Sequence, residues 1–329
     1  MTQHTSRRAF LAAVGVAAIA GCAGGRQAGG SGGQASDTQT STAEPTADPQ
    51  ATSTDESGPG APPPTVEPAL PLPMAPGALE REAVSGGPPK DGIPSIDDPS
   101  FVPADSVADR FEPGDPVFGL ERGGEVKAYP QKILVLHEIC NDVVDGTPVS
   151  VTYCPLTGTA MGFERGDTTF GVSGRLVNNN LIMYDRGTET WWPQVLATAI
   201  PGPWNGAPET TSLSEFRLVW TTWGKWTAKH PDTQVLSFDT GFAKNYSRDP
   251  YGSYNPREGY YADGASPMFQ ALNTDDRLAP KRVVIGTRTA EGAAAFDKRT
   301  LRETKLLAGD LAGSPTVAVY DPELDTGYV

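Results

Sequence analysis

Apolar residues alternate with polar ones between residues 115 and 130, and this pattern predicts a β-hairpin. The segments 117–120 and 126–129 flank the turn Gly123-Gly124, an arrangement typical of two antiparallel strands. Pro130 ends the second strand, because proline lacks the amide hydrogen that a strand needs. The apolar spacing that follows predicts a short helix over residues 131–139.

A second hairpin follows, and the whole pattern returns near the C-terminus. Asp145-Gly146 is a two-residue turn signal between 143–144 and 149–153. Segment 282–327 repeats the order of segment 115–160, with one slip expected at the turn before residue 292. The matched positions include Val284 with Val117, Phe296 with Tyr129, Leu301 with Leu134, Gly313 with Gly146 and Tyr320 with Tyr153. We therefore predict an internal duplication.

These elements predict one β-rich α+β body over residues 91–329. It contains two related strand–helix–strand units with an insertion between them. Within the insertion, Trp220, Trp223 and Trp226 are spaced by three, which predicts a helix with one aromatic face. His230-Pro231 is expected to end that helix.

The N-terminus carries the features of an export signal. Arg7-Arg8 stands before an apolar run that ends in Ile19-Ala20-Gly21-Cys22, which predicts twin-arginine export and lipidation of Cys22. Residues 23–90 are rich in Gly, Ser, Thr and Pro, a composition that predicts a disordered tether. The mature protein is thus expected on the outer face of the cytoplasmic membrane, held there by its lipid.

Charge narrows the range of partners. The chain of 329 residues has 40 acidic and 26 basic residues, a formal net charge of -14. Such a surface disfavours a nucleic-acid partner, and the scarcity of Lys with abundant Asp and Glu predicts a halophilic source. The high content of Pro and Gly excludes a helical bundle and a protein with many membrane spans.

The candidate chemistry gathers in one short stretch. After the signal, the chain has only two Cys and two His. His137, Cys140 and Cys154 fall within 18 residues, and the Asp145-Gly146 hairpin would place His137 opposite Cys154. In either a helical or an extended form of residues 131–140, we expect His137 beside a sulfur.

Four interpretations of this stretch remain open. The first is a structural Cys140–Cys154 disulfide, which suits an exported protein. The second is a soft-metal site, copper or zinc, with His137, Cys154 and Cys140 as ligands. The third is a Cys154 nucleophile activated by His137, with Asp142 or Glu138 orienting the imidazole. The fourth is a pair of inert buried thiols.

The motifs of the body resemble the domain-of-unknown-function 3179 family over roughly residues 95–322. The resemblance is carried by His137-Glu138-Ile139, Tyr153-Cys154-Pro155-Leu156, Phe170–Gly174, Met183–Arg186 and Thr221–Asp232. It implies a single fold and no particular activity. Many members look to carry a second Cys where Thr157 stands, so this chain departs from a fixed Cys-x-x-Cys redox motif.

Other residues are candidates for a ligand pocket. Asp185 and Arg186 precede a Trp pair, and Tyr251 and Tyr254 belong to a tyrosine-rich loop, residues 246–261, that we expect to cover the site. Asn245 begins an N-glycosylation pattern.

Two functions follow from these observations. One is a membrane-tethered protein whose His137 and Cys154 bind a soft metal or perform thiol chemistry. The other is a non-enzymatic surface binding module in which the Cys140–Cys154 bridge is structural.

Overall fold

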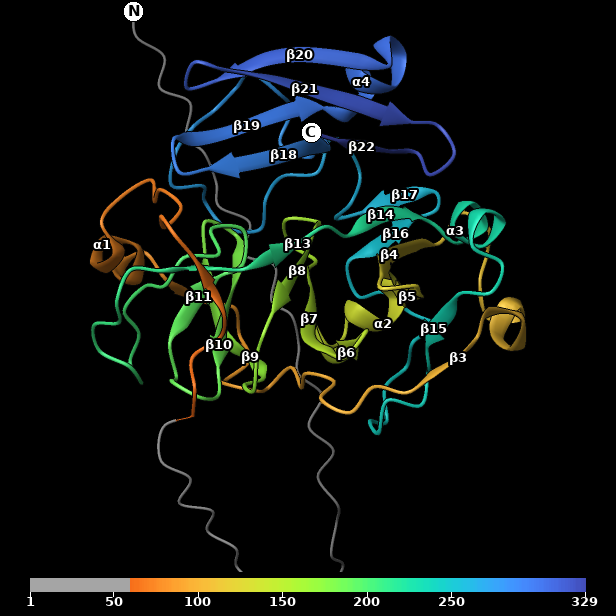
Figure 1. The fold of residues 1–329 in the computed structure, drawn as a ribbon, viewed down its shortest axis with the longest axis horizontal. Helices are drawn as coiled ribbons and strands as arrows, with labels where there is room; N and C mark the ends of the chain where they lie inside the picture. Colours follow the sequence, from red (N-terminus) through yellow and green to blue (C-terminus); the bar gives the residue numbers. More distant parts are fainter. Residues whose placement is uncertain (1–59) are drawn as a thin grey trace, which may run out of the picture. The chain divides into compact units, whose positions relative to one another are not determined.

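The structure, a computed structural model, describes residues 60–329 (Figure 1). The predicted signal, the lipidation site Cys22 and residues 23–59 of the predicted tether lie outside these residues. The helices are short: α1 (Pro76–Arg81), η1 (Ala104–Arg110), α2 (Gln131–Leu134), α3 (Trp223–Lys229) and α4 (Lys298–Thr304). Within residues 60–329 no helix has the length and hydropathy to cross a membrane.

Strands dominate, as the predicted β-rich α+β class requires, and most belong to three sheets. The first has the order β14 (Val219–Thr222), β4 (Pro116–Arg122), β5 (Glu125–Pro130), β15 (Gln234–Leu236) and β3 (Phe101–Pro103). The second has the order β13 (Glu215–Phe216), β8 (Thr159–Glu164), β7 (Thr147–Cys154) and β6 (Ile139–Val144). The third has the order β11 (Trp191–Pro193), β10 (Asn180–Asp185), β9 (Phe170–Val177) and β2 (Val84–Ser85).

The remaining strands form small sheets. They are the pair β1 (Thr65–Val66) and β12 (Ser212–Leu213), the pair β16 (Gly252–Tyr254) and β17 (Arg257–Gly259), the pair β18 (Val284–Thr289) and β19 (Gly292–Asp297), and the three strands β20 (Leu306–Leu311), β21 (Ser314–Asp321) and β22 (Thr326–Tyr328). We call β4–β8 with α2 the first module, and β18–β22 with α4 the second module.

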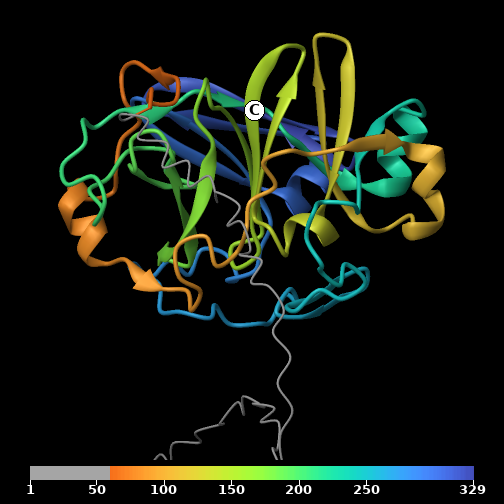
Figure 2. The ribbon, with the colours of Figure 1, turned by 90° about the horizontal axis from the view of Figure 1, so that it is seen from below.

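The two hairpins of the first module stand side by side (Figure 2). Their turns are at the expected Gly123-Gly124 and Asp145-Gly146. One face of β6–β7 packs against the β4–β5 hairpin and α2, and the apolar side chains that meet there include Phe118, Tyr129, Leu134, Cys140, Val151 and Tyr153. Strand alternation sends the neighbouring residues to the opposite face, which packs on β9 and β10 through Ile139, Cys154, Phe170, Val172 and Leu181.

The second module repeats the strand registers of the first at a fixed spacing of 167 residues. The pair Val117↔Pro130 recurs as Val284↔Asp297, and Ile139↔Thr152 recurs as Leu306↔Val319. The slip expected before residue 292 is not present, because β5 begins at Glu125 and β19 begins at Gly292 after turns of equal length.

The face of β20–β21 that corresponds to the β9- and β10-facing side of β6–β7 is much less buried. In the first module, β9 and β10 cover this face, so Ile139, Ser150 and Thr152 are fully buried. In the second module the matching residues stand exposed: Leu306, Val317 and Val319 are 52%, 42% and 47% accessible. The covering sheet thus belongs to the first module alone.

Three local predictions are corrected by the structure. The predicted tether, 23–90, is too long at its C-terminal end, because α1 buries Leu79 and β2 pairs with β9. The helix predicted over residues 131–139 ends at Leu134 and continues as a turn. Trp220 lies on β14 rather than on the helix, which begins at Trp223 and ends, as expected, at His230.

Asn141 connects the second sheet to the third. This residue is fully buried, and its amide makes four hydrogen bonds. Its Oδ1 accepts from Ser150 Oγ at 2.5 Å and from the Phe170 backbone amide at 3.0 Å. Its Nδ2 donates to the Phe170 carbonyl at 2.9 Å and to Asp97 Oδ1 at 2.6 Å. An asparagine amide has two donors and two acceptor positions, so Asn141 is fully satisfied.

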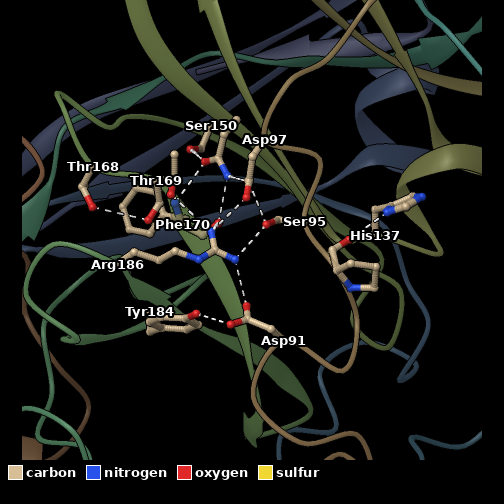
Figure 3. Close-up of polar contacts among 12 residues, drawn as sticks. Asp91, Ser95, Asp97, His137, Ser150, Thr168, Thr169, Phe170, Tyr184 and Arg186 are labelled. Atoms are coloured by element: carbon tan, nitrogen blue, oxygen red, sulfur yellow. Dashed lines mark hydrogen bonds and ion pairs between the residues drawn. The ribbon is translucent and has the colours of Figure 1, made fainter. Parts of the chain in front are cut away.

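Arg186 extends this network and fastens the segment 91–97 across the sheets. Its guanidinium pairs with Asp91 at 2.9 Å and with Asp97 at 3.3 Å, and it donates to Ser95 Oγ at 3.2 Å (Figure 3). Tyr184 donates a hydrogen bond to the other oxygen of Asp91. The segment is therefore held by charged groups in addition to its backbone hydrogen bonds, which include a parallel bridge between Ile96 and β6.

We expect Asn141→Ala to lower the free energy of unfolding by about 3 kcal/mol, because it leaves buried donors and acceptors of Phe170 unpaired. Chemical denaturation measures this loss. The matched control is Asn273→Ala, which changes the same residue type at an exposed position and should shift stability by less than about 0.5 kcal/mol. Equal stability of the two variants would contradict the role given to Asn141.

Candidate functional site

Cys154 ends strand β7, and its thiol donates a hydrogen bond to the Asn179 carbonyl at 3.7 Å. The residue is 1% exposed, and the Leu181 backbone amide donates to Sγ at 3.4 Å. The polar groups of the nearby Thr157 and the Leu181 amide act to lower the pKa of the thiol. The larger influence is burial, which raises that pKa, and the carboxyl of Glu138 raises it further.

The same turn in the second module holds a carboxylate. Asp321 lies 167 residues after Cys154, and its Oδ1 accepts hydrogen bonds from the backbone amides of Glu323 at 2.9 Å and Leu324 at 3.2 Å. Leu324 is the counterpart of Thr157. The turn after this strand therefore directs amide hydrogens at the side chain of its first residue, an arrangement that favours an anion there.

Glu138 supplies a second titratable group. Its side chain is buried, and no described residue donates a hydrogen bond to the carboxyl. Burial alone raises the pKa of Glu138 to about 8. Its φ of 59° is not a mark of site-specific strain, because the matching Lys305 has a φ of 69° after α4.

The tyrosine loop and one lysine complete the surroundings of the sulfur. Tyr251 packs against the core that contains Cys154, and burial, followed by the charges of Glu138 and Cys154, raises the pKa of Tyr251 to about 12. Tyr260 Oη donates to the Leu156 carbonyl at 3.0 Å. Lys281 Nζ lies 3.2 Å from the centre of the Tyr260 ring. A buried thiol and a buried carboxyl thus lie near a half-buried amine.

His137 lies in the turn before β6 and does not bind a sulfur, which corrects the expectation above. Its Nδ1 lies 2.8 Å from the Pro94 carbonyl, and its Nε2 lies 2.7 Å from Tyr246 Oη. A carbonyl only accepts, so Nδ1 carries the hydrogen and Nε2 accepts from Tyr246. Burial lowers the pKa of His137, in keeping with a neutral ring. His137 holds the start of the tyrosine loop in place.

The predicted disulfide and the predicted metal-ligand set are also corrected. Cys140 and Cys154 are free thiols in two different apolar cores, on opposite faces of β6–β7. Among residues 60–329, no three His, Cys, Asp or Glu side chains gather as a possible metal site. Asp142 does not orient His137, because its carboxylate accepts from Lys127 at 2.9 Å and from Tyr129 Oη at 2.6 Å.

The four predicted pocket residues divide into two pairs. Asp185 is fully buried and binds Trp192 Nε1 at 2.9 Å, and Arg186 belongs to the Asn141 network. Both are therefore structural. Tyr251 lies by Cys154, and Tyr254 lines a large cleft between the modules. Asn245, the predicted glycosylation site, is exposed.

Sequence reasoning gave Glu138 only a supporting role and missed Lys281. A comparison of the two modules could have pointed to Glu138, because it aligns with the oppositely charged Lys305, just as Cys154 aligns with Asp321. Lys281 comes from a segment without a recognisable motif, and only the fold brings it to the sulfur.

A comparison with models of known protein families found a match. A family model described as "Protein of unknown function (DUF3179)" matches residues 90–328. No curated protein and no solved structure matches the chain.

We predict that Glu138→Gln stabilises the protein at alkaline pH. In the unfolded chain Glu138 ionises near its ordinary pKa of 4.5, whereas in the folded protein it keeps its proton up to about pH 8. Wild-type stability should therefore fall between those pH values. The free energy of unfolding of the variant relative to wild type should rise by about 3–4 kcal/mol between pH 4.5 and 8.5. Exposed Glu258→Gln is the control, and a flat difference for Glu138→Gln would refute the assignment.

Proposed function

The chain belongs to the DUF3179 family, and we propose that it is a protein with a reactive thiol, Cys154, whose proton is taken by Glu138. The site lies at the end of β7, beneath the tyrosine loop. Its chemistry is attack by sulfur on an electrophilic atom of a small molecule.

The observation that supports this most directly is the set of donors around Sγ. A thiolate is the nucleophilic form of cysteine, and the Leu181 amide donates to the atom that would bear its charge, with the polar groups of Thr157 nearby. The second module uses the matching turn to hold the carboxylate of Asp321. The backbone is thus arranged for a negative charge at position 154 before any ligand arrives.

Glu138 suits the role of proton acceptor. A base works best when its pKa lies near the working pH, and burial gives Glu138 a pKa of about 8. In the reaction the thiol proton moves to the Glu138 carboxylate, and a bond forms between Sγ and the electrophilic carbon or sulfur of the ligand. The bond from that atom to its leaving group breaks, and the leaving group departs with the electron pair.

We also infer that the two modules arose by duplication and that the site belongs to the first copy alone. The constant spacing of the registers supports the common origin. At the matched positions the second module has Lys305 for Glu138 and Asp321 for Cys154. The scaffold therefore forms without the thiol and the carboxyl, which supports a chemical rather than a packing role for this pair.

We propose further that the protein acts outside the cell, attached by a lipid on Cys22. Arg7-Arg8, the apolar run and the residues before Cys22 support this location. The acidic, Lys-poor composition supports a halophilic source. No nucleic acid is expected as a partner.

Alkylation of the native, full-length protein with iodoacetamide tests the thiol, with the modified residue identified by peptide mass spectrometry. We expect Cys154 to react at least tenfold faster than Cys140, which is equally buried but lies on the other face of the hairpin. The rate at Cys154 should rise with pH through about 8, where Glu138 loses its proton.

The variants Glu138→Gln and Glu258→Gln separate the role of the carboxyl from a general change of charge. Glu138→Gln should remove the inflection near pH 8 and slow the reaction, whereas Glu258→Gln should leave both unchanged. If Cys154 is modified only after denaturation, together with Cys140, the proposed function fails.

The anchor is tested by expressing the full chain with Cys22→Ser in a host that carries twin-arginine export. The wild-type protein should sediment with membranes, and the variant should be recovered in the soluble exported fraction. Sedimentation of both forms with membranes would contradict lipidation at Cys22.

A further inference from the structure

A large cleft opens beside the thiol, between the second module and the strands β8, β13 and β14. Its volume is about 1420 Å³. Leu156 and Thr157, from the turn after Cys154, form part of one wall, and β18, β19 and α4 form much of the other. Figure 1 shows β18 above β13 and β8. A ligand in the cleft therefore reaches the turn that carries the reactive group.

The lining of this cleft has the opposite charge to the protein as a whole. The chain carries a net charge of -14, yet Lys and Arg are twice as numerous as Asp and Glu along the cleft. Several of these cations are neutralised by the protein itself. Arg282 pairs with Asp297 at 2.6 Å, and Arg302 pairs with Asp325 at 2.5 Å.

Lys281 is different, because no carboxylate of residues 60–329 lies within ion-pair distance of its Nζ. Its contacts are the face of Tyr260, 3.2 Å from the ring centre, and the Leu156 carbonyl at 3.4 Å. Arg257 lies near it and donates to the Lys281 carbonyl at 3.5 Å. Burial, followed by the charge of Arg257, lowers the pKa of Lys281 to about 8. Arg257 is itself paired with Asp263 at 2.6 Å, so Lys281 is the member of this pair that lacks a carboxylate partner among the described residues and that an incoming anion would neutralise.

We propose that the ligand of the Cys154 site carries a small anionic group, such as a carboxylate, which binds Lys281. This inference rests on the proposed function for its link to the thiol. The anion site itself stands on the cleft and on the charges of its wall. The electrophilic atom of the ligand would then lie between this anionic group and the Cys154 sulfur.

Calorimetric titration of the full-length protein with malonate tests the anion site without any reaction at the thiol. Lys281→Met should weaken binding at least tenfold. The matched control is Lys305→Met, because Lys305 also packs over a tyrosine, 4.6 Å from the Tyr320 ring, but does not line the cleft. Wild-type binding should weaken between pH 7 and pH 9 as Lys281 loses its proton, and Lys281→Met should not show this change. Absent malonate binding, or equal binding by wild type and Lys281→Met, would overturn the proposal.

A pair of alkylating reagents then connects the anion site to Cys154. Iodoacetate and iodoacetamide form the same type of thioether and release iodide, but only iodoacetate is anionic. Relative to N-acetylcysteine, the rate ratio of iodoacetate to iodoacetamide at Cys154 should be at least fivefold higher in wild type and should return to the reference in Lys281→Met. An unchanged ratio in both proteins would refute the link. If neither reagent modifies Cys154 while malonate binding still depends on Lys281, the thiol function fails and the anion site is retained.

Discussion

The buried amide of Asn141 is the constraint on which the rest of the structure depends. It lies on β6, and its four hydrogen bonds reach β7 through Ser150, β9 through Phe170 and the segment 91–97 through Asp97. A buried amide tolerates only an arrangement in which all of its donors and acceptors are satisfied. The second and third sheets are therefore fixed in register against one another. Cys154 lies in the apolar core between the same two sheets, so the position of its sulfur depends on this junction.

The candidate site places two buried titratable groups, Cys154 and Glu138, near a third, Lys281, that is half-buried. In such a place the charge of one group changes the free energy needed to charge the next. An ionised Glu138 opposes a thiolate at Cys154, whereas a protonated Lys281 favours it. The protonation states of the three groups are therefore coupled, and an anion that enters the cleft would alter that balance. This coupling gives the site a way to respond to its ligand through proton transfer alone.

The sequence predicted the features that depend on neighbouring residues. Both hairpins of the first module and their turns follow from strand periodicity and turn chemistry over a few positions. Contacts between distant segments could not be predicted in this way. The partner of His137 is Tyr246, 109 residues later, and no local pattern connects the two. His137 lies in a turn because β6 begins only at Ile139, and strand alternation sends Cys140 and Cys154 to opposite faces of β6–β7. The predicted imidazole–thiol contact and the predicted disulfide were therefore both wrong.

The left-handed residue before β6 is shared by the two modules, since Glu138 and Lys305 have nearly the same backbone conformation. The hydrogen bonds to the carbonyl of this residue also match. The backbone amide of Tyr153 donates to the Glu138 carbonyl at 2.7 Å, and that of Tyr320 donates to the Lys305 carbonyl at 2.9 Å. One main-chain framework thus displays either a carboxyl or an ammonium group at this position. Under the duplication that we infer, side-chain substitutions alone were enough to create or remove the reactive centre. The backbone conformation did not have to change.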